Sequence, residues 1–555
     1  MKKLLFVALA ALGFVACNND MDEAAHSGEV ETSYIAINLN AVDNSTRAEG
    51  GVYQEGDAAE REVKSAYFFF FDQYGNPFTV TAEEGKPATA PRGGVNWISA
   101  SLTDTNDKTE TTNVSDIKDA VLLLSTYVGM YPSQIIAVLN WAPTASEPYS
   151  LNDLYAATNI QGIEGAFVMS NAVYADGSKK EVVGTPLTSE YIHKSEAEAK
   201  AHPITIYVER IAAKVTVTAK EGITTNNHFK VERNVVLGGI EKAVYVEVLG
   251  WALHNDFTQS KLLKDINPTW ENSELGFTWN DTPWHRCYWA TSLLFEQIGS
   301  NTFPSTFSLQ LGDNANVAAG TYIDKTYTYV GENTNYNTTD KTANCTKVII
   351  KAKLKEKDGD TYKDLPLARW YSTYYAGEEQ LRTAVANTIQ YQYYWNESGS
   401  DSYIKIAPSD LKIVADDNMV KFQLSDDVTS KNWYIKTGDT YTSKTIEQMN
   451  TLLSGIEKAV YYKSGETLYS VDIAHLGYQL SGDQLGDYGV VRNHIYNIIL
   501  KSFGGFGSPV YVPGSNLEYP DDPYYDSKDY VSAEVRVLSW RLVSQEVDVQ
   551  PTPQP

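Results

Sequence analysis

The segment Ile204-Thr-Ile-Tyr-Val-Glu-Arg-Ile-Ala-Ala-Lys-Val-Thr-Val-Thr-Ala-Lys220 carries a strong signal for the fold. Isoleucine, valine, threonine and tyrosine dominate it, and these residues are enriched in β-strands. Apolar and other residues alternate along it with a period of two, as expected of strands with a buried face. The regularity is interrupted near Arg210, so the segment predicts two consecutive strands.

The same strand-forming composition extends over the rest of the chain. Tyrosine is abundant, with 38 residues, whereas methionine is scarce, with 6. Further strand-like runs bounded by turn residues lie at 66–71, 135–141, 165–171, 243–254, 347–354, 458–473 and 490–501. Val114–Met130 and Leu151–Thr158 show helical spacing, and no short repeat indicates a solenoid or propeller. We therefore expect a mainly β protein.

The amino-terminal residues indicate export. Lys2 and Lys3 precede an apolar run, Leu4–Val15, which is short for a membrane span and typical of a signal peptide. A small residue, Ala16, then precedes Cys17, as in a lipoprotein signal. We expect Cys17 to be acylated and to begin the mature chain. An ordinary secretory peptide with an incidental cysteine is the alternative.

The first strand signal follows a polar tether. Ile35, Ile37 and Leu39 fall on one face at a period of two, which predicts a half-buried strand. A polar loop, residues 43–51, follows and contains Arg47. Loops of this kind are accessible to proteases.

The carboxyl-terminal end carries another isolated strand. Residues 503–529 are rich in Gly, Pro, Tyr and Asp and predict a linker, after which Tyr530–Val549 reads as one strand. Its apolar positions are Val531, Ala533, Val535 and Val537, continued past a phase slip near Leu538 by Trp540 and Leu542. A Pro-rich stub ends the chain.

The first and last strands together suggest a mechanism by which copies of the chain could assemble. A first strand that is removed by proteolysis leaves an open sheet edge, which is a template for pairing with another chain. The last strand of a second copy could complete that sheet by strand complementation. Such a contact is head-to-tail and generates a filament. Pairing of both strands within their own chain is the alternative.

Composition and motifs argue against several other functions. The formal net charge is -25 and Lys and Arg do not cluster, which argues against a nucleic-acid partner. Motifs for nucleophilic catalysis, phosphate binding and metal binding are missing from the sequence. We expect no catalytic residue, no cofactor and no metal. Cys287 and Cys345 permit one disulfide, and their pairing is left open.

Three segments resemble a known family. Gly489–Ile498, with the sequence Gly-Val-Val-Arg-Asn-His-Ile-Tyr-Asn-Ile, resembles the VxRNxxYxI segment of the Bacteroidales fimbrillins, the type V pilin superfamily. Ser532–Trp540 resembles the final strand of the minor-fimbria (Mfa-type) shaft subunits. Val208–Val215 is similar to a late strand of the family's amino-terminal domain.

This resemblance implies two transthyretin-like β-sandwich domains with a few short helices and a carboxyl-terminal donor strand. It places the segments as follows: 1–16 signal peptide, 17–47 tether and removable strand, 48–222 amino-terminal sandwich, 223–502 carboxyl-terminal sandwich, 503–529 linker, and 530–555 donor strand and stub. It also implies cleavage by an arginine-specific protease between Arg47 and Ala48.

The same resemblance implies a fimbrial shaft subunit that supports adhesion and biofilm formation. Its partners would be copies of itself, anchor and tip subunits, and the outer membrane, which holds the lipidated precursor before the processed chain joins the cell-surface fimbrium. The alternative is a surface glycan-binding lipoprotein, which an exposed row of Trp and Tyr would favour.

Overall fold

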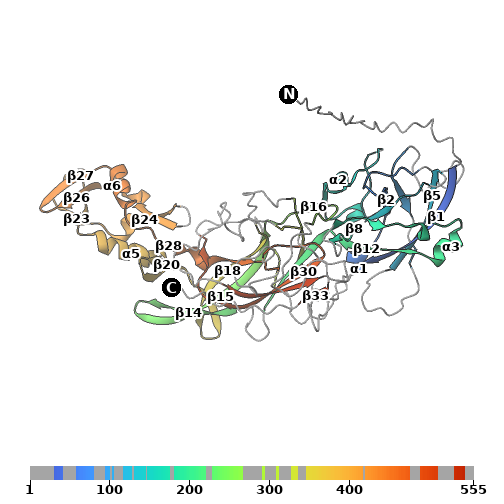
Figure 1. Cartoon of the computed structure of the whole chain (residues 1–555). Helices are drawn as coiled ribbons and strands as arrows, with labels where there is room; N and C mark the ends of the chain where they lie inside the picture. The colour runs from blue at the N-terminus through green and yellow to red at the C-terminus, as the bar shows by residue number, and fades with distance from the viewer. Residues whose placement is uncertain are drawn as a thin grey trace, which may run out of the picture.

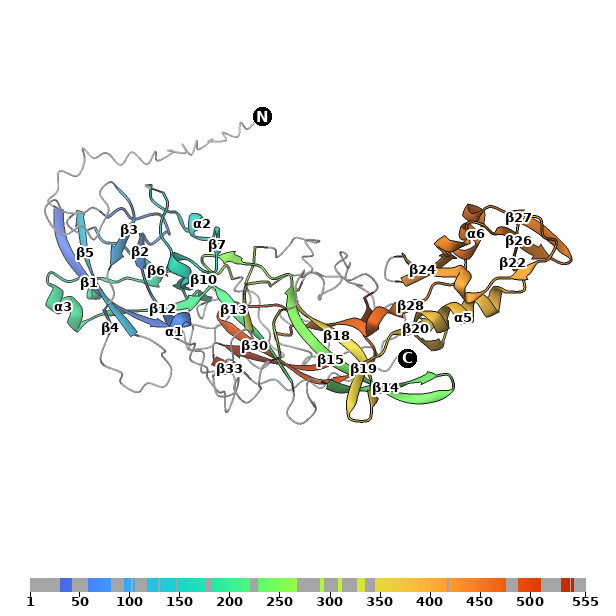
Figure 2. The same cartoon turned by 180° about the vertical axis from the view of Figure 1, so that it is seen from behind.

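The structure of the protein is a computed structural model. It describes residues 30–41, 58–80, 94–100, 103–104, 117–127, 130–145, 147–175, 181–219, 228–266, 290–293, 308–311, 327–334, 345–416, 419–475, 488–510, 531–539 and 541–543. Strands dominate these residues, which confirms the mainly β prediction. Three lobes follow one another along an elongated molecule (Figures 1 and 2). None of the described helices is long and apolar enough to cross a bilayer.

The first lobe is built on a nine-stranded sheet in the order β3-β2-β6-β8-β12-β1-β5-β4, with β11 paired to β6. Its strands are β1 (Val30–Ala41), β2 (Ala66–Phe71), β3 (Trp97–Ala100), β4 (Thr103–Asp104), β5 (Ile117–Tyr127), β6 (Gln134–Leu139), β8 (Met169–Asn171), β11 (Thr185–Pro186) and β12 (Ile204–Arg210). Apolar side chains from β1, β2, β5, β6 and β12 share one core. Ile35 and Ile37 of β1 belong to this core.

Short elements complete this lobe and its junction with the next. They are α1 (Ala58–Arg61), α2 (Leu151–Leu154), α3 (Glu196–Ala201), the pair β9 (Tyr174–Ala175) and β10 (Glu181–Val182), and the pair β7 (Ala157–Asn159) and β16 (Gln259–Lys261). The helix α2 falls within the predicted helical segment Leu151–Thr158. It begins with a capping box in which Ser150 and Asp153 bond each other's backbone N–H groups.

The helical interpretation of Val114–Met130 is wrong. Ile117–Tyr127 is the strand β5, which pairs with β1 along its whole length. Ala120, Leu122 and Leu124 are buried at a period of two. A continuous apolar run is compatible with both the helical period of 3.6 and the strand period of two. Here the segment forms a strand because it pairs with β1, which is distant in sequence.

The second lobe contains an eleven-stranded sheet in the order β17-β13-β30-β14-β15-β18-β29-β31, with β19, β32 and β33 as side branches. Its strands are β13 (Ala212–Ala219), β14 (His228–Leu237), β15 (Ile240–His254), β17 (Tyr327–Gly331), β18 (Lys347–Asp358), β19 (Thr361–Asp364), β29 (Glu466–Asp472), β30 (His494–Phe503), β31 (Ser508–Pro509), β32 (Val531–Ser539) and β33 (Arg541–Val543). The predicted break near Arg210 is confirmed, because β12 ends there and β13 starts the second sheet. The opening segment thus crosses from one sheet to the other.

The third lobe, which we call the inserted unit, spans residues 367–462 and interrupts the second sheet between β19 and β29. Its elements are β20 (Leu367–Trp370), β21 (Thr373–Ala376), α5 (Gly377–Ile389), β22 (Tyr393–Asn396), β23 (Ile404–Lys405), β24 (Leu411–Asp416), β25 (Met419–Leu424), β26 (Asn432–Thr437), β27 (Thr440–Lys444), α6 (Ile446–Leu453) and β28 (Val460–Tyr462). These elements bury a core of their own. The chain enters and leaves through adjacent strands, because β20 pairs antiparallel with β28.

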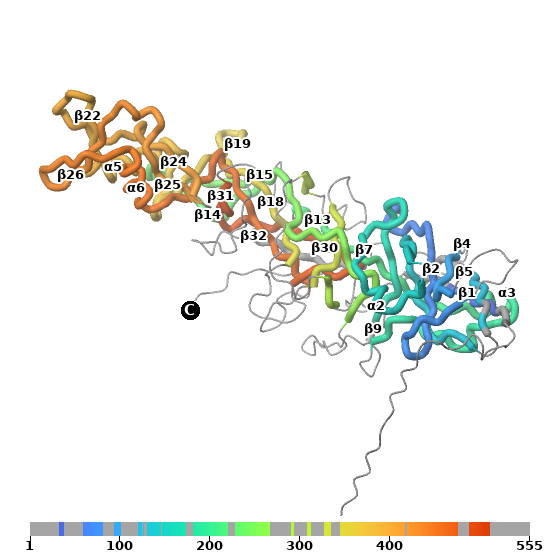
Figure 3. The backbone as a smooth tube through the Cα atoms, turned by 90° about the horizontal axis from the view of Figure 1, so that it is seen from above, coloured from blue at the N-terminus to red at the C-terminus, as the bar shows by residue number. Residues whose placement is uncertain are grey.

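The inserted unit lies at the end of the molecule opposite the first lobe (Figure 3). The resemblance to the fimbrillins predicts that these residues are part of a single carboxyl-terminal domain, 223–502. The domain boundaries remain a prediction.

Candidate functional site

The strand β1 occupies an interior position in its sheet. It pairs antiparallel with β5 from Val30 to Asn40 and parallel with β12 from Ile37 to Ala41. Ile35 and Ile37 are both 0% exposed and belong to the lobe's core. Leu39 lies opposite Ile206 in the register. Removal of β1 would therefore open two strand edges and an apolar slot at the same place.

The predicted processing sites surround this strand in sequence. Cys17 precedes it, and Arg47 and Ala48 lie between the end of β1 and the start of α1. All three residues lie outside the described part of the structure, so lipidation and cleavage remain predictions.

The chain just beyond the predicted cut is held by a buried polar cluster. The Glu60 carboxylate, in α1, accepts a hydrogen bond from Lys214 Nζ at 2.5 Å and another from the Tyr329 hydroxyl at 2.5 Å. Arg210 Nε donates to the Glu60 backbone carbonyl at 2.7 Å. The side chains of Lys214 and Glu60 are 0% and 1% exposed. Burial, followed by the nearby Glu60 carboxylate, raises the pKa of Tyr329, so the phenol stays protonated and donates.

The segment that resembles the fimbrillin motif is also buried, and its polar groups serve the fold. Arg492 donates to the Glu332 carboxylate through Nε at 3.1 Å and Nη2 at 3.0 Å. It also donates to the backbone carbonyls of Lys261 and Leu262 at 2.8 and 3.2 Å. The Arg492 and Glu332 side chains are 0% and 1% exposed, so each buried charge is compensated.

The other polar residues of this segment fasten β30 to its neighbours. Asn493 adopts a left-handed conformation, with φ of 58°, and its backbone N–H donates to Ala212. The Tyr496 hydroxyl accepts from the backbone N–H of Val491 at 2.8 Å. Asn497 accepts from the Thr216 hydroxyl at 2.9 Å. The bonds of Asn493 and Asn497 join β30 to β13 within the second sheet, and the bond of Tyr496 is local to the segment, so these residues have a structural role.

The carboxyl-terminal strand β32 pairs with β30 of its own chain. The register runs from His494 opposite Ser539 to Phe503 opposite Val531. Ala533 lies opposite Leu500, Val535 opposite Ile498 and Val537 opposite Tyr496. These three residues of β30 belong to the second core. In the single chain, β32 therefore completes the second sheet.

Two details differ from the sequence-based expectation. Tyr530–Val549 does not continue as one strand, because β33 folds back so that Leu542 lies opposite Leu538. The phase slip near Leu538 thus marks a reversal of the chain. Trp540 lies outside the described residues. In addition, the start of the predicted linker is ordered, with Phe506 only 1% exposed and Ser508–Pro509 paired to β29.

No group of three or more His, Cys, Asp or Glu side chains suited to a metal occurs among the described residues. Cys345 is buried, and Cys287 lies outside the described residues, so their pairing stays open.

Comparison with known proteins agrees with the placement of the motif. Residues 460–546 match the family described as "Major fimbrial subunit protein type IV, Fimbrillin, C-terminal". No curated protein sequence matches the chain.

Several solved structures are similar over most of the chain at low identity. A candidate cell adhesion protein from Parabacteroides distasonis is 11% identical, with a TM-score of 0.38, and covers 92% of this chain and 98% of that one. A fimbrilin (fimA) from Porphyromonas gingivalis is 11% identical, with a TM-score of 0.31 and the same two coverages, 92% and 98%.

The tip fimbrial protein Mfa3 from Porphyromonas gingivalis is 10% identical, with a TM-score of 0.26, and covers 91% of this chain and 100% of that one. The family match contains β30 and β32, the strands in which the resemblance was recognised. The carboxyl-terminal part of the chain, residues 460–546, is therefore similar to the carboxyl-terminal region of the fimbrillins.

Proposed function

We propose that the chain is a fimbrial shaft subunit that is exported as a lipoprotein through Cys17 and cleaved between Arg47 and Ala48. Cleavage releases β1, and the carboxyl-terminal strand of another copy enters the vacated position. Repetition of this step builds a head-to-tail polymer on the cell surface. The proposed role is structural, and it requires no catalytic residue or cofactor.

The interior position of β1 carries this proposal. A strand that pairs on both edges and buries Ile35 and Ile37 leaves a well-defined acceptor when it departs. Each aliphatic side chain that refills the slot contributes about 1.5–3 kcal/mol of burial free energy. The alternating apolar residues of β32 suit that slot, because strand addition combines ladder hydrogen bonds with side-chain pockets.

The cluster around Glu60 supports the proposed order of events. It fastens α1 to β13 and β17, so the chain after the cut stays attached while β1 is released. The pairing of β32 with β30 adds a second condition for polymerisation, besides the removal of β1. The donor strand must leave its own sheet before it can enter that of another copy. In the uncut precursor, β1 therefore fills the acceptor position and β32 is paired with β30.

Limited proteolysis followed by electron microscopy tests the proposal. The purified precursor should remain monomeric, and treatment with trypsin should produce filaments whose subunits begin at Ala48 on amino-terminal sequencing. Filaments that retain Ile35 and Ile37 would contradict the role of β1 as a removable strand.

The lipid anchor is tested separately by intact-mass analysis of the membrane fraction. We expect an acyl adduct on a chain that begins at Cys17, and its loss in Cys17→Ser. A membrane-bound chain without any adduct would exclude the lipoprotein route.

A further inference from the structure

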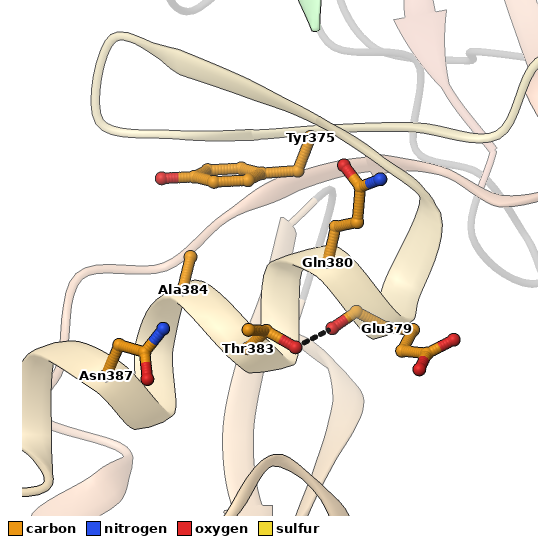
Figure 4. A pocket seen from close by; sticks show the side chains of 6 residues that line it. All are labelled: Tyr375, Glu379, Gln380, Thr383, Ala384 and Asn387. Atoms are coloured by element: carbon orange, nitrogen blue, oxygen red, sulfur yellow. Dashed lines mark hydrogen bonds between the residues drawn. The ribbon is translucent and has the colours of Figure 1, made fainter. Parts of the chain in front are cut away.

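The inserted unit carries an open pocket between β21 and α5 that the polymerisation mechanism does not use. The pocket has a volume of about 550 Å³ and is lined by Tyr375, Glu379, Gln380, Thr383, Ala384 and Asn387. Figure 4 shows the Tyr375 ring across from the α5 residues, with Gln380 and Asn387 on either side. The lining therefore combines one aromatic ring with several hydrogen-bonding side chains.

Two of these side chains are fixed by local bonds. Gln380 Oε1 accepts from the backbone N–H of Ala376 at 3.0 Å, which orients the amide and leaves its NH₂ group to donate. The Thr383 hydroxyl donates to the Glu379 backbone carbonyl at 2.8 Å. Within the described residues, the Glu379 carboxylate and the Asn387 side-chain amide make no hydrogen bond or ion pair.

The charge of the lining restricts the ligand. None of the six lining residues is cationic, and the nearby Arg382 is already committed to the Glu378 carboxylate and the Leu411 carbonyl. A carboxylate or sulfate on a ligand would meet no counter-charge and would face Glu379. An apolar ligand would leave the amides without partners.

We propose that this pocket binds a neutral sugar, with the ring of Tyr375 against the sugar's C–H face and Gln380 and Asn387 bonded to its hydroxyls. A sugar ring presents C–H groups on its faces and hydroxyls at its edge. The negatively polarised face of an aromatic ring attracts the C–H groups of the sugar. Side-chain amides both donate and accept hydrogen bonds, so they can bond to the sugar hydroxyls. The pocket volume lies within the usual range for small-molecule sites.

Saturation-transfer NMR on the full chain tests this assignment, with D-galactose, N-acetyl-D-galactosamine and D-glucose as neutral probes and N-acetylneuraminic acid as the anionic probe. At least one neutral sugar should show transfer, whereas the anionic sugar should not. Tyr375→Ala should weaken binding about tenfold, and Asn387→Ala, on the exposed side of α5, should weaken it while leaving the fold intact.

Two further variants separate a binding role from a structural one. Tyr375→Phe retains the ring and should retain binding, and Tyr391→Ala, at a tyrosine 67% exposed outside the pocket, should bind like the parent. Transfer that persists in both Tyr375→Ala and Asn387→Ala overturns the site, as does the lack of transfer to any neutral probe. A preference for the anionic probe overturns the ligand class. Because filament assembly is scored independently by microscopy, failure here leaves the proposed polymerisation untouched.

Discussion

At the scale of single residues, the buried pair of Arg492 and Glu332 gives a direct prediction. Arg492→Ala leaves the Glu332 carboxylate buried without its partner, so we expect the free energy of unfolding to fall by about 3–5 kcal/mol. A urea titration measures this change. The matched control is Lys412→Ala, whose partner Asp426 has a side chain 88% exposed, and that loss should stay below about 1 kcal/mol. Equal effects of the two variants would contradict the structural role of Arg492.

Glu181 gives a prediction of pH dependence. Burial raises the pKa of its carboxyl to about 7 from an ordinary value of 4.5, and the Asp265 carboxylate adds to the rise, whereas the hydrogen bond from the Ile266 backbone N–H opposes it. The folded state therefore binds more protons than the unfolded state between these values, so stability falls as pH rises from 4.5 to 7. Urea midpoints across this window should decline less in Glu181→Gln. An equal decline in both proteins would exclude Glu181 as the source.

The sequence located the important carboxyl-terminal segment but not the reason for it. Arg492 belongs to the segment that resembled the fimbrillins, yet its carboxylate partner lies 160 positions away. Likewise, nothing near Glu60 in the sequence indicates that Lys214 and Tyr329 bond to it. Contacts at such separations depend on the register of the sheets, which local patterns do not encode.

At the scale of elements, the proposed polymerisation predicts that β32 must separate from β30 before filaments can form. Ser502 and Ser532 lie opposite each other in that ladder, so the double variant Ser502→Cys/Ser532→Cys places two nearly isosteric thiols at a Cα separation suited to a disulfide. The oxidised variant should remain monomeric after trypsin treatment. Reduction should restore filament formation to the parental level, as judged by electron microscopy.

The single variant Ser502→Cys is the control for this experiment and should form filaments under both redox conditions. Filaments of the oxidised double variant, with the disulfide verified by mass, would show that the carboxyl-terminal strand is not the donor.

The elements themselves were only partly predictable. Short alternating patterns identified β1 and the β12–β13 pair, because one buried face imposes a period of two. The contiguous apolar residues of β5 fit helical spacing as well, and its pairing with β1 settled the matter. In the inserted unit, Thr445 and Gln448 form a capping box at the start of α6, and this spacing is a helix-start signal in the sequence.

At the scale of the whole molecule, the inserted unit should be separable from the rest. Arg369 and Val460 lie opposite each other in antiparallel strands, so an Asn-Gly turn in place of Trp370–Ala459 can close a hairpin there. Because the unit has its own core, the shortened chain should fold and should form filaments after trypsin treatment. Circular dichroism and electron microscopy check both outcomes. Loss of the β-sheet signal would mean that the two main sheets depend on the unit.

The order of strands in the two main sheets could not be derived from the chain. The segment that opens at Ile204 was recognised as two strands, but not as the connection by which the chain passes from the first sheet to the second. The separate core formed by residues between Ala368 and Tyr461 was missed because most of its strands are short and their apolar positions meet only in three dimensions.

The long ladder between β1 and β5 has a mechanical consequence for a fibre assembled as proposed. We consider a pull that acts along the length of a strand seated in that position. Its backbone bonds on both sides are then sheared together instead of being peeled one after another. Failure of the junction is governed by the rate of rupture under load rather than by an equilibrium constant. Such a fibre could keep a cell tethered in flow even though no covalent bond joins its subunits.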